Sequence, residues 1–185
     1  MRIVGGKFKG REIKGPISEV TRPTSDRVRE SIFNILAHGI DGFTLEDVRV
    51  IDLFAGTGAL GLEALSRGAR FCCFVEDDAG ARGIIRANAD LCGAIGQTKI
   101  WRRDATLLGP CAPQTPYGLA FCDPPYGRGL GEKALASLVA GQWLLPHAVV
   151  VLEEAARRVV ADVPGLTVVD VREYGDTQVR IYRAA

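Results

Sequence analysis

The stretch Val50-Ile-Asp-Leu-Phe-Ala-Gly-Thr-Gly-Ala-Leu-Gly61 places a glycine-rich segment directly after a short apolar run. The apolar run is typical of a buried strand, and leucines at helical spacing follow from Leu60 onward. The glycines between them fit the pattern G-x-G-x-x-G: Gly56, Gly58 and Gly61. Glycine suits such a turn because a Cβ atom would prevent the close approach of a ligand. The stretch therefore predicts a strand, a tight turn and a helix that bind a nucleoside cofactor.

Two carboxylates near this turn strengthen the cofactor interpretation. Asp52 ends an otherwise apolar strand, where an unpaired charge is costly unless it has polar partners or faces a polar ligand. Glu76 comes 20 residues after Gly56 and just past the apolar run 71–75, where a carboxylate can accept both hydroxyls of a ribose. The glycine pattern alone is also compatible with simple strand-to-helix packing in a chain that has 22 glycines.

The length of the chain limits the number of domains, and its charge distribution indicates the kind of partner. The chain has 185 residues, of which 47% are hydrophobic and 24% charged, as expected for one globular domain with a full core. The formal net charge of +1 is unevenly distributed: residues 1–29 carry eight Lys or Arg and three Asp or Glu, a net +5, which leaves −4 for the remainder. The amino-terminal segment is therefore a basic patch, for which phosphate groups are the expected partners.

The cysteines and histidines argue against several kinds of site. The five cysteines are odd in number, lack C-x-x-C spacing and mostly lie within apolar runs, which is typical of reduced core residues in a cytoplasmic protein. His38 and His147 are the only histidines, so the sequence offers too few suitable side chains for a structural zinc site or a Ser-His-Asp triad. The sequence shows no charged-then-apolar leader and no apolar run of spanning length, so secretion and membrane insertion are not expected.

Apolar runs and helical periods alternate along the chain. Residues 1–15 favour a short hairpin or extended arm with one basic side, and a solvated ribbon is the alternative. A helix follows, capped by Thr24 or Ser25 and continuing to about Ala37. Further strands are expected near 49–53, 70–75, 98–102, 117–122 and 148–152, and helices near 59–67, 78–92 and 129–142. This alternation predicts a parallel sheet with helices on both faces. Gly175-Asp176, between 166–173 and 177–182, predicts a final antiparallel hairpin.

The segment Asp123-Pro-Pro-Tyr126 follows the expected strand 117–122, at the edge where open α/β sheets bind ligands. The two prolines stiffen the backbone and remove two N–H donors, which leaves carbonyl groups and the Asp123 carboxylate as acceptors beside an aromatic ring. Such a set suits a planar amine. Taken alone, the segment would indicate a strand-ending turn with an aspartate cap. After a nucleoside-binding turn, it favours an amine site.

Together these motifs resemble the ordered motifs of class I S-adenosylmethionine-dependent methyltransferases that modify exocyclic amino groups. The matching parts, which extend over nearly the whole chain, are residues 52–58, Glu76, Asp104 and 123–126. The arm 1–11, the segment 21–36 and the ending 179–183 narrow the resemblance to the RsmD family, the 16S ribosomal RNA (guanine-966, N2) methyltransferases. The resemblance implies a Rossmann-like α/β fold: a mostly parallel seven-stranded sheet with an antiparallel carboxyl-terminal hairpin, helices on both faces and a small basic amino-terminal extension.

The resemblance also implies roles for individual residues. The residues expected to bind S-adenosylmethionine are Asp52, Phe54, Gly56, Gly58, Glu76, Asp77, Asp104 and Ala105. Among them, Glu76 would hold the ribose, and Asp104 with the Ala105 backbone would reach the adenine edge. The expected catalytic residues are Asp123, Pro124, Pro125 and Tyr126, and the basic arm supplies the expected RNA contacts, Lys7, Lys9, Arg11, Arg22, Arg27 and Arg29.

The chemistry of an amine target follows from these residue types. A guanine N2 amine is a poor nucleophile because its lone pair is delocalised into the ring, so a catalyst must position it towards the methyl group. Asp123 and the Pro124 carbonyl can each accept one N–H, while Tyr126 stacks on the base. No metal ion is required. Because N2 is engaged in base pairing, the target base should be unpaired or flipped out.

The predicted organisation is a basic arm, 1–24, and a methyltransferase domain, 25–185, acting as a cytoplasmic monomer on the small ribosomal subunit. Two other interpretations stay open. An adenine-N6 or other amino-methyltransferase acting on DNA would use the same Asp-Pro-Pro-Tyr site, although the short chain leaves little room for a separate DNA-recognition domain. A non-catalytic RNA-binding or dinucleotide-binding domain would share the glycine turn and Glu76, but it gives no reason for Asp123 to Tyr126.

Overall fold

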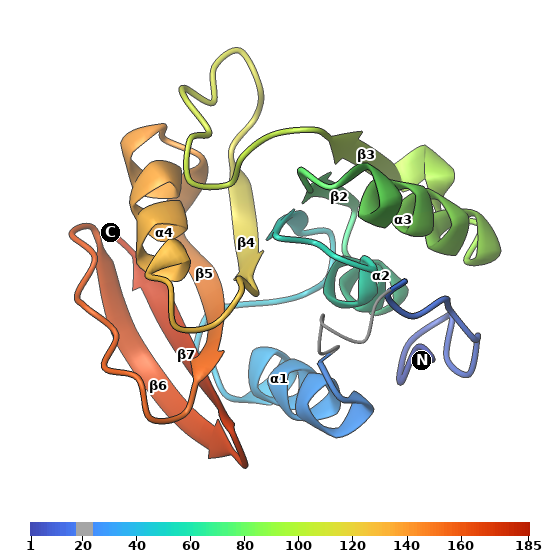
Figure 1. Ribbon diagram of the computed structural model, residues 1–185, viewed down its shortest axis with the longest axis horizontal. Coiled ribbons are helices and arrows are strands. Elements are labelled where there is room, and N and C mark those ends of the chain that lie inside the picture. Colours follow the sequence, from blue (N-terminus) through green and yellow to red (C-terminus); the bar gives the residue numbers. More distant parts are fainter. Residues whose placement is uncertain (18–23) are drawn as a thin grey trace.

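One mixed sheet forms the centre of the structure, a computed structural model that describes residues 1–17 and 24–185 (Figure 1). Within these residues the sheet has seven strands in the spatial order β3-β2-β1-β4-β5-β7-β6. The strands are β1 (Arg49–Leu53), β2 (Phe71–Val75), β3 (Thr98–Trp101), β4 (Tyr117–Cys122), β5 (Leu144–Ala155), β6 (Leu166–Tyr174) and β7 (Thr177–Ala184). The helices are α1 (Asp26–His38), α2 (Ala59–Ser66), α3 (Ala79–Leu91) and α4 (Leu130–Ala140), with a 3-10 turn η1 (Ile95–Gln97).

The first five strands run parallel, and an antiparallel pair completes the sheet. β1 pairs with β2 on one side and with β4 on the other, so the strand order reverses between β1 and β4. At such a reversal the connections leave in opposite directions and the carboxyl ends of the two strands open a crevice. β7 pairs antiparallel with both β5 and β6, which confirms the hairpin expected around Gly175-Asp176.

Helices cover both faces of the sheet, and each face has its own apolar core. Successive strand residues point to opposite faces because the side-chain period of a strand is two. Phe74 of β2 and Phe121 of β4 belong to the core that includes residues of α1, α2 and α3. Their neighbours Val75 and Cys122 belong to the core that includes α4. Strands buried on both faces explain why they appear in the sequence as continuous apolar runs.

The first helix begins at the predicted cap. The hydroxyl of Ser25 accepts a hydrogen bond from the backbone N–H of Val28 at 3.2 Å, which satisfies one of the donors that lack a partner at the start of a helix. Ile32, Phe33 and Leu36 are buried on the side that faces the sheet. The cap therefore fixes where α1 starts, and its apolar side fixes how it packs.

Strand β5 begins four residues before the predicted start at 148. Its first pairing joins Leu144 to Tyr117, and the register then shifts before Leu119. The backbone N–H of Tyr117 donates to the Trp143 carbonyl at 2.8 Å, so the sheet continues beyond the apolar run. Pro146 and His147 are exposed here, which is why hydrophobicity alone missed this part of the strand.

The buried indole of Trp143 anchors the proline-rich loop before β4. Its Nε1–H donates to the Gly109 carbonyl at 2.8 Å, and its ring stacks with Tyr117 at a centroid distance of 6.3 Å. The ring of Trp101 lies on another side at 5.3 Å. The indole therefore fixes the loop against the core that includes α4.

The amino-terminal arm is a short antiparallel ribbon in which Arg2 bridges to Glu12. Ile3, Phe8 and Ile13 are buried in the same core as α1 and α2. Burial of these side chains removes apolar surface from water and so favours the docked position of the arm. The arm is therefore packed against the domain, and the alternative of a solvated ribbon is wrong for this part of the chain.

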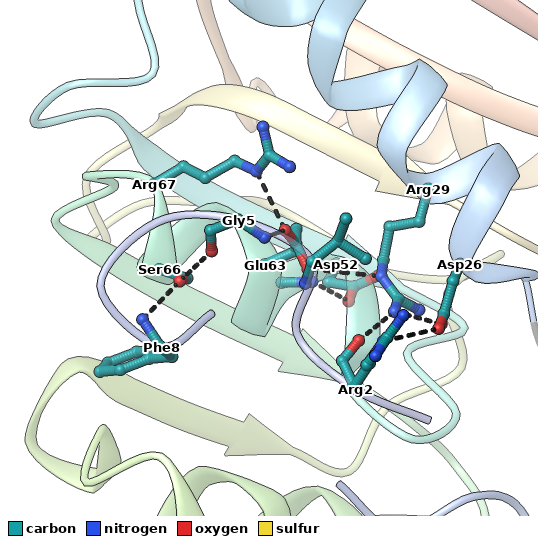
Figure 2. A network of polar contacts seen from close by, with 11 residues as sticks. Arg2, Gly5, Phe8, Asp26, Arg29, Asp52, Glu63, Ser66 and Arg67 are labelled. Carbon is teal, nitrogen blue, oxygen red and sulfur yellow. Dashed lines mark hydrogen bonds and ion pairs between the residues drawn. The ribbon is translucent and has the colours of Figure 1, made fainter. Parts of the chain in front are cut away.

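A buried carboxylate on α2 holds the arm in place (Figure 2). Glu63 accepts the backbone N–H groups of Val4 at 2.9 Å and Gly5 at 2.8 Å. The same carboxylate pairs with Arg67 at 3.0 Å and with Arg29 at 3.4 Å. Two arginines and two backbone donors thus compensate one buried negative charge, as a buried acid requires.

The burial of Arg29 corrects one of the RNA-contact predictions. Its side chain is fully buried, pairs with Glu63 and Asp26, and donates to the carbonyl of Arg2. The prediction that Arg29 contacts RNA is wrong, because a guanidinium enclosed by protein carboxylates cannot reach a phosphate. Arg22, another predicted RNA contact, lies outside the described residues. Charge counted along the sequence does not reveal which side of α1 faces the core.

Candidate active site

A cavity of about 700 Å³ opens at the carboxyl ends of β1, β2 and β4, where the strand order reverses. This volume is typical of a small-molecule site. The cavity brings together eight of the predicted cofactor-binding and catalytic residues: Asp52, Phe54, Gly56, Glu76, Asp123, Pro124, Pro125 and Tyr126. The arm adds Met1, Pro16 and Ile17 to the wall, so both the arm and the sheet shape this site.

Each glycine of the turn serves a different structural purpose. Gly56 has φ of +59°, and a Cβ there would meet no atom nearer than 3.9 Å, so a ligand can approach its backbone. Gly58 has φ of +80° and is the N-cap of α2. A Cβ on Gly61 would lie 2.4 Å from the ring of Phe74, so this glycine lets α2 pack closely on β2. The pattern therefore serves ligand approach at its first glycine and packing at its third.

Asn88 on α3 connects the glycine turn to the arm. Its amide nitrogen donates to the carbonyl of Thr57 at 2.9 Å and to the carbonyl of Lys14 at 3.0 Å. Its amide oxygen accepts the backbone N–H of Lys14 at 2.7 Å. One fully buried side chain therefore fixes the turn relative to the arm, and sequence reasoning had assigned it no role.

Asp52 lies at the floor of the cavity and is almost fully buried. Its carboxylate accepts the backbone N–H of Gly61 at 3.1 Å, which gives the first turn of α2 an acceptor. Burial raises the pKa of Asp52 well above its ordinary value, the Gly61 hydrogen bond lowers it, and the negative charges of Asp123 and Glu76 raise it further. The buried carboxyl that the sequence placed at the end of β1 thus supports α2 and lines the cavity.

Glu76 follows β2 and holds the glycine turn by a hydrogen bond. Its Oε1 accepts the N–H of Gly56 at 2.9 Å, and its Oε2 accepts the N–H of Asp78 at 3.0 Å. Asp78 caps α3 by accepting the N–H of Ala81 at 2.7 Å, and it also lines the cavity. Each carboxylate oxygen of Glu76 retains a further acceptor position for a hydroxyl group.

The remaining predicted cofactor residues do not line the cavity: Gly58, Asp77, Asp104 and Ala105. Asp104 follows β3, and its Oδ1 accepts the hydroxyl of Thr106 at 2.7 Å and the Thr106 backbone N–H at 2.8 Å. These hydrogen bonds lower the pKa of Asp104, the hydroxyl bond having the larger effect. The predicted contact of Asp104 with the adenine edge stays a prediction.

The Asp123 segment stands at the cavity next to the end of β1. The backbone N–H of Asp123 donates to the Leu53 carbonyl at 3.4 Å, which continues the pairing of β4 with β1. Pro124 is buried and Pro125 is exposed. The two prolines thus extend from the sheet edge towards solvent, with the Asp123 carboxylate beside the glycine turn.

The aromatic ring after the prolines is held at the cavity mouth. The hydroxyl of Tyr126 lies 3.1 Å from the hydroxyl of Thr177 on β7, and the residue is 36% exposed. The following residue, Gly127, donates its N–H to Oε1 of the buried Glu154 at 3.0 Å. The anchors come from β7 and β5, two strands that pair antiparallel, and nothing in the sequence pattern connects them with the site.

A second carboxylate lies behind Asp123. The hydroxyl of Thr24 lies 3.2 Å from Asp123 Oδ2 and 3.0 Å from Glu153 Oε1. Burial raises the pKa of Asp123 to about 7, the Thr24 hydrogen bond lowers it, and the negative charge of Glu154 raises it. For Glu153, burial followed by the charge of Asp123 raises the pKa well above its ordinary value. Its sequence signal was a pair of acids inside the apolar run of β5.

The exposed basic residues lie outside the cavity or at its mouth. Lys7, Lys9, Arg11 and Arg27 are exposed, as their predicted contacts with RNA require. Lys7 and Arg11 lie over the ring of Phe8 at 5.0 and 5.1 Å. Arg128 is also exposed and lines the cavity beside Tyr126, which adds one cation that was not among the predicted site residues.

A second, more open hollow of about 820 Å³ lies between α4 and the loop before β4. Among the described residues that line it, Lys133 alone is charged, and the glycine turn, Glu76 and Asp123 all lie elsewhere. The carboxylates and the glycine turn therefore make the cavity at the ends of β1, β2 and β4 the candidate functional site.

The side chains and helices of residues 1–17 and 24–185 bear on metal binding and membrane insertion. In this part of the chain no group of three or more His, Cys, Asp and Glu side chains is arranged to hold a metal ion. None of its helices is long and apolar enough to cross a membrane. All five cysteines are buried free thiols, which confirms their predicted place in the core.

Comparison with known proteins connects this arrangement with methyltransferases. A family described as conserved hypothetical protein 95 matches residues 1–183. The chain is 37% identical over 165 residues to ribosomal RNA small subunit methyltransferase D of Escherichia coli K12, over 89% of this chain and 79% of that protein. The solved structure of the putative methyltransferase yhhF from Escherichia coli is 32% identical, with a TM-score of 0.84 over 100% of this chain and 97% of that one.

A more distant structure shares the fold. An RNA methyltransferase from Salinibacter ruber, solved in complex with S-adenosyl-L-homocysteine, has a TM-score of 0.65 at 16% identity and covers 88% of this chain and 94% of its own. These likenesses confirm the predicted Rossmann-like architecture with its mostly parallel sheet and antiparallel hairpin.

Proposed function

The chain belongs to the family described as conserved hypothetical protein 95, and on that premise we propose that it methylates ribosomal RNA. The proposed reaction transfers a methyl group from S-adenosylmethionine to the exocyclic N2 amine of a guanine in 16S ribosomal RNA of the small subunit. The observation that carries this proposal is the position of Asp123 and Pro124 in the same cavity as Gly56 and Glu76. A cofactor-binding turn and an amine-binding segment thus share one chamber.

The cavity suits S-adenosylmethionine in size and in charge. Its volume of about 700 Å³ lies within the range of cofactor sites. Gly56 leaves its backbone open to a ligand, and Glu76 offers acceptor positions to the ribose hydroxyls. Asp52, Asp78 and Asp123 also line the cavity, and a lining of carboxyl groups suits a cationic sulfonium better than the anionic pyrophosphate of a dinucleotide. The proposed contacts of Asp77, Asp104 and Ala105 complete this assignment.

Asp123 and Pro124 would hold the amine so that its lone pair faces the methyl group. S-adenosylmethionine supplies an electrophilic methyl group when it is bound. The amine nitrogen forms the new N–C bond as the S–C bond breaks, and that electron pair returns to sulfur. Asp123 then accepts the proton that the nitrogen loses. A carboxylate with a pKa of about 7 is suited to accept it near neutral pH.

The base would be fixed by Tyr126 and held outside a duplex. The ring of Tyr126 is anchored to Thr177 and partly exposed at the cavity mouth, where it can stack on a planar base. Guanine N2 takes part in base pairing, so the substrate nucleotide must be unpaired or flipped out. The site therefore demands an accessible nucleotide, which folded ribosomal RNA offers in its loops.

The exposed arm would supply contacts to the phosphate backbone. Lys7, Lys9, Arg11 and Arg27 are exposed cations at this end of the chain, and Arg22 completes the proposed set. Phosphate contacts fix the position of an RNA without reading its sequence. We assign the reaction to the cytoplasm and to a monomer made of a basic arm, 1–24, and a methyltransferase domain, 25–185.

The direct test supplies labelled S-adenosylmethionine together with small ribosomal subunits, large subunits, free ribosomal RNA or DNA. The expected product is N2-methylguanosine in 16S RNA, found by digestion to nucleosides, with Asp123→Asn as the inactive control. Label recovered as N6-methyladenine in DNA would favour the alternative substrate. The absence of transfer to every nucleic acid, with intact cofactor binding, would contradict the proposal.

A further inference from the structure

One threonine hydroxyl is shared by two carboxylates beside the proposed reaction site. Thr24 Oγ1 lies 3.2 Å from Asp123 Oδ2 and 3.0 and 3.3 Å from the two oxygens of Glu153. Thr24 and Asp123 line the cavity, whereas Glu153 lies behind them and is 2% exposed. A hydroxyl has a single hydrogen and can donate it to only one acceptor at a time. One of the two carboxylates therefore lacks a donor from Thr24 if both are ionised.

Within residues 1–17 and 24–185, most of the charges that act on this pair are negative. Asp52 on β1 and Glu154 on β5 add negative charge to its surroundings. Among the described cations, Arg29 on α1 acts on Glu153, and its guanidinium is already paired with Glu63 and Asp26. Two like charges that share one partly buried donor are costly, and such a pair retains a proton.

The position of the proton follows from burial and access. Glu153 is more deeply buried than Asp123, and the negative charge of Asp123 adds to the effect of burial on its pKa. When Glu153 carries the proton, its O–H donates to Thr24 Oγ1, and the Thr24 hydrogen is then free to donate to Asp123. Every polar atom in this chain of hydrogen bonds has a partner, as a buried polar network requires.

We propose that Glu153 is a positioning residue that holds a proton in the resting enzyme and, through Thr24, keeps Asp123 ionised and oriented towards the substrate amine. This inference rests on the proposed function, because it assigns to Asp123 the proton that the amine loses. In the transfer step, the N–C bond forms, the S–C bond breaks, and the N–H electron pair returns to nitrogen as the proton passes to Asp123 Oδ1. Glu153 keeps its own proton throughout.

Infrared difference spectroscopy tests the location of the proton without any methyl transfer. At about pH 8, above the pKa of Asp123, a protonated carboxylic acid band should be present in the wild type and in Asp123→Asn but absent in Glu153→Gln. Asp52 is also buried, so the spectra are compared as wild type minus each variant. A band lost in Asp123→Asn and kept in Glu153→Gln would overturn the proposal, as would a band unaffected by either change.

Single-turnover rates test the positioning role and remain decisive if Glu153→Gln fails to fold. Thr24→Val removes the hydroxyl at nearly constant volume, and the rate should fall about tenfold to a hundredfold with little change in cofactor affinity. Its pH–rate curve should also shift to higher pH, because the Thr24 hydrogen bond lowers the pKa of Asp123. Thr24→Ser should restore both the rate and the curve.

Glu153→Gln completes the set, because its amide can donate to Thr24 as the protonated acid does. Its transfer rate should stay within about threefold of the wild type, a difference below 1 kcal/mol in barrier. A much faster Glu153→Gln enzyme would mean that Asp123 holds the proton in the wild type and would overturn the assignment. Failure to methylate any RNA would count against the proposed function alone, since the infrared result is independent of it.

Discussion

The carboxylate of Glu63 accepts the backbone N–H of Gly5 at 2.8 Å and thereby joins the arm to helix α2 (Figure 2). Glu63 is fully buried and also pairs with Arg29 and Arg67. The basic arm is for this reason a structural part of the domain. Its cations are presented on a fixed surface, which reduces the conformational entropy that RNA binding must overcome.

Replacement of Glu63 by glutamine should destabilise the fold. The amide cannot compensate the buried charge of Arg29, and one of its donors would face donors of the arm, so we expect a loss of about 3 kcal/mol in the free energy of unfolding. Urea denaturation measures this change. The matched control is Asp47→Asn, which removes an exposed pair with Arg70 at 3.9 Å and should change stability by less than about 1 kcal/mol. Equal effects of the two changes would contradict a stabilising role for the Glu63 network.

Glu76→Ala should weaken the binding of S-adenosylmethionine at least about tenfold, because the ribose hydroxyls lose a charged acceptor. The structure adds a second reason, since Glu76 also accepts the N–H of Gly56 and holds the glycine turn. Calorimetry measures the affinity, and circular dichroism checks the fold. The control Asp90→Ala removes an exposed negative charge on α3, outside the cavity lining. If both variants lose affinity equally, general electrostatic attraction and not ribose binding is responsible.

Asp123→Asn should lower the rate of methyl transfer far more than it lowers cofactor affinity. The amide places a donor against the N–H of the substrate and removes the proton acceptor, so its effect concentrates on the transition state. We expect a fall of about a hundredfold or more in the single-turnover rate. Asp90→Asn on the exposed side of α3 is the matched control. A variant as fast as the wild type would reduce Asp123 to a structural cap.

The pH dependence of methyl transfer should report the ionisation of Asp123. Its pKa is raised to about 7, so the carboxyl is largely protonated below that value and cannot accept a proton from the amine. The single-turnover rate should therefore rise with pH through about 7 and then level off. In Asp123→Asn the residual rate should lose this step. A wild-type rate that is flat between about pH 5 and 8 would show that Asp123 is not the proton acceptor.

Changing Lys7, Lys9 and Arg11 to alanine should weaken RNA binding. The slope of log binding constant against log salt concentration should also become shallower, by roughly 0.7 to 0.9 for each phosphate contact that is lost. These side chains are exposed on a docked arm and can reach phosphates. Cofactor affinity should not change, since none of the three lines the cavity.

The control for the arm variant removes three exposed cations from the part of the chain after residue 29, which is net acidic. These cations are Lys99, Arg102 and Arg157. This variant has the same net charge as the arm variant. RNA binding curves across a salt series should separate the two. Parallel lines of equal intercept would mean that the arm does not contact the backbone, and Arg128 would then be the next candidate.

Local patterns were sufficient to predict most of the fold. The strands of a doubly covered sheet are continuous apolar runs, and strong caps and glycines separate them from the helices, so most predicted bounds differ from the observed ones by a residue or two. The ends of parallel strands meet at one edge, which is why Asp52, Glu76 and Asp123 could be placed together from their positions after three separate runs.

The partners behind the site could not be predicted, because they depend on how distant segments pack. Thr24 and Glu153 lie 129 positions apart in the sequence, and nothing in either local pattern indicates their contact. Arg29 looked like a surface cation because charge was counted along the sequence, whereas α1 turns this side chain towards the Glu63 carboxylate. Both cases concern buried polar groups, whose environment is set by tertiary structure.

The docked arm also has a consequence for the order in which the chain folds. Its backbone N–H groups bind side chains that are distant in the sequence. Val4 donates to Glu63, 59 positions later, Phe8 to Ser66, 58 positions later, and Lys14 to Asn88, 74 positions later. During synthesis, Ile3 and Phe8 leave the ribosome before the helices that will bury them exist. Contacts of such sequence separation form late because a long loop must close first. The arm is translated before α2 and α3 and is therefore among the last segments to reach its native position, and its apolar side chains stay accessible to chaperones until these helices have folded.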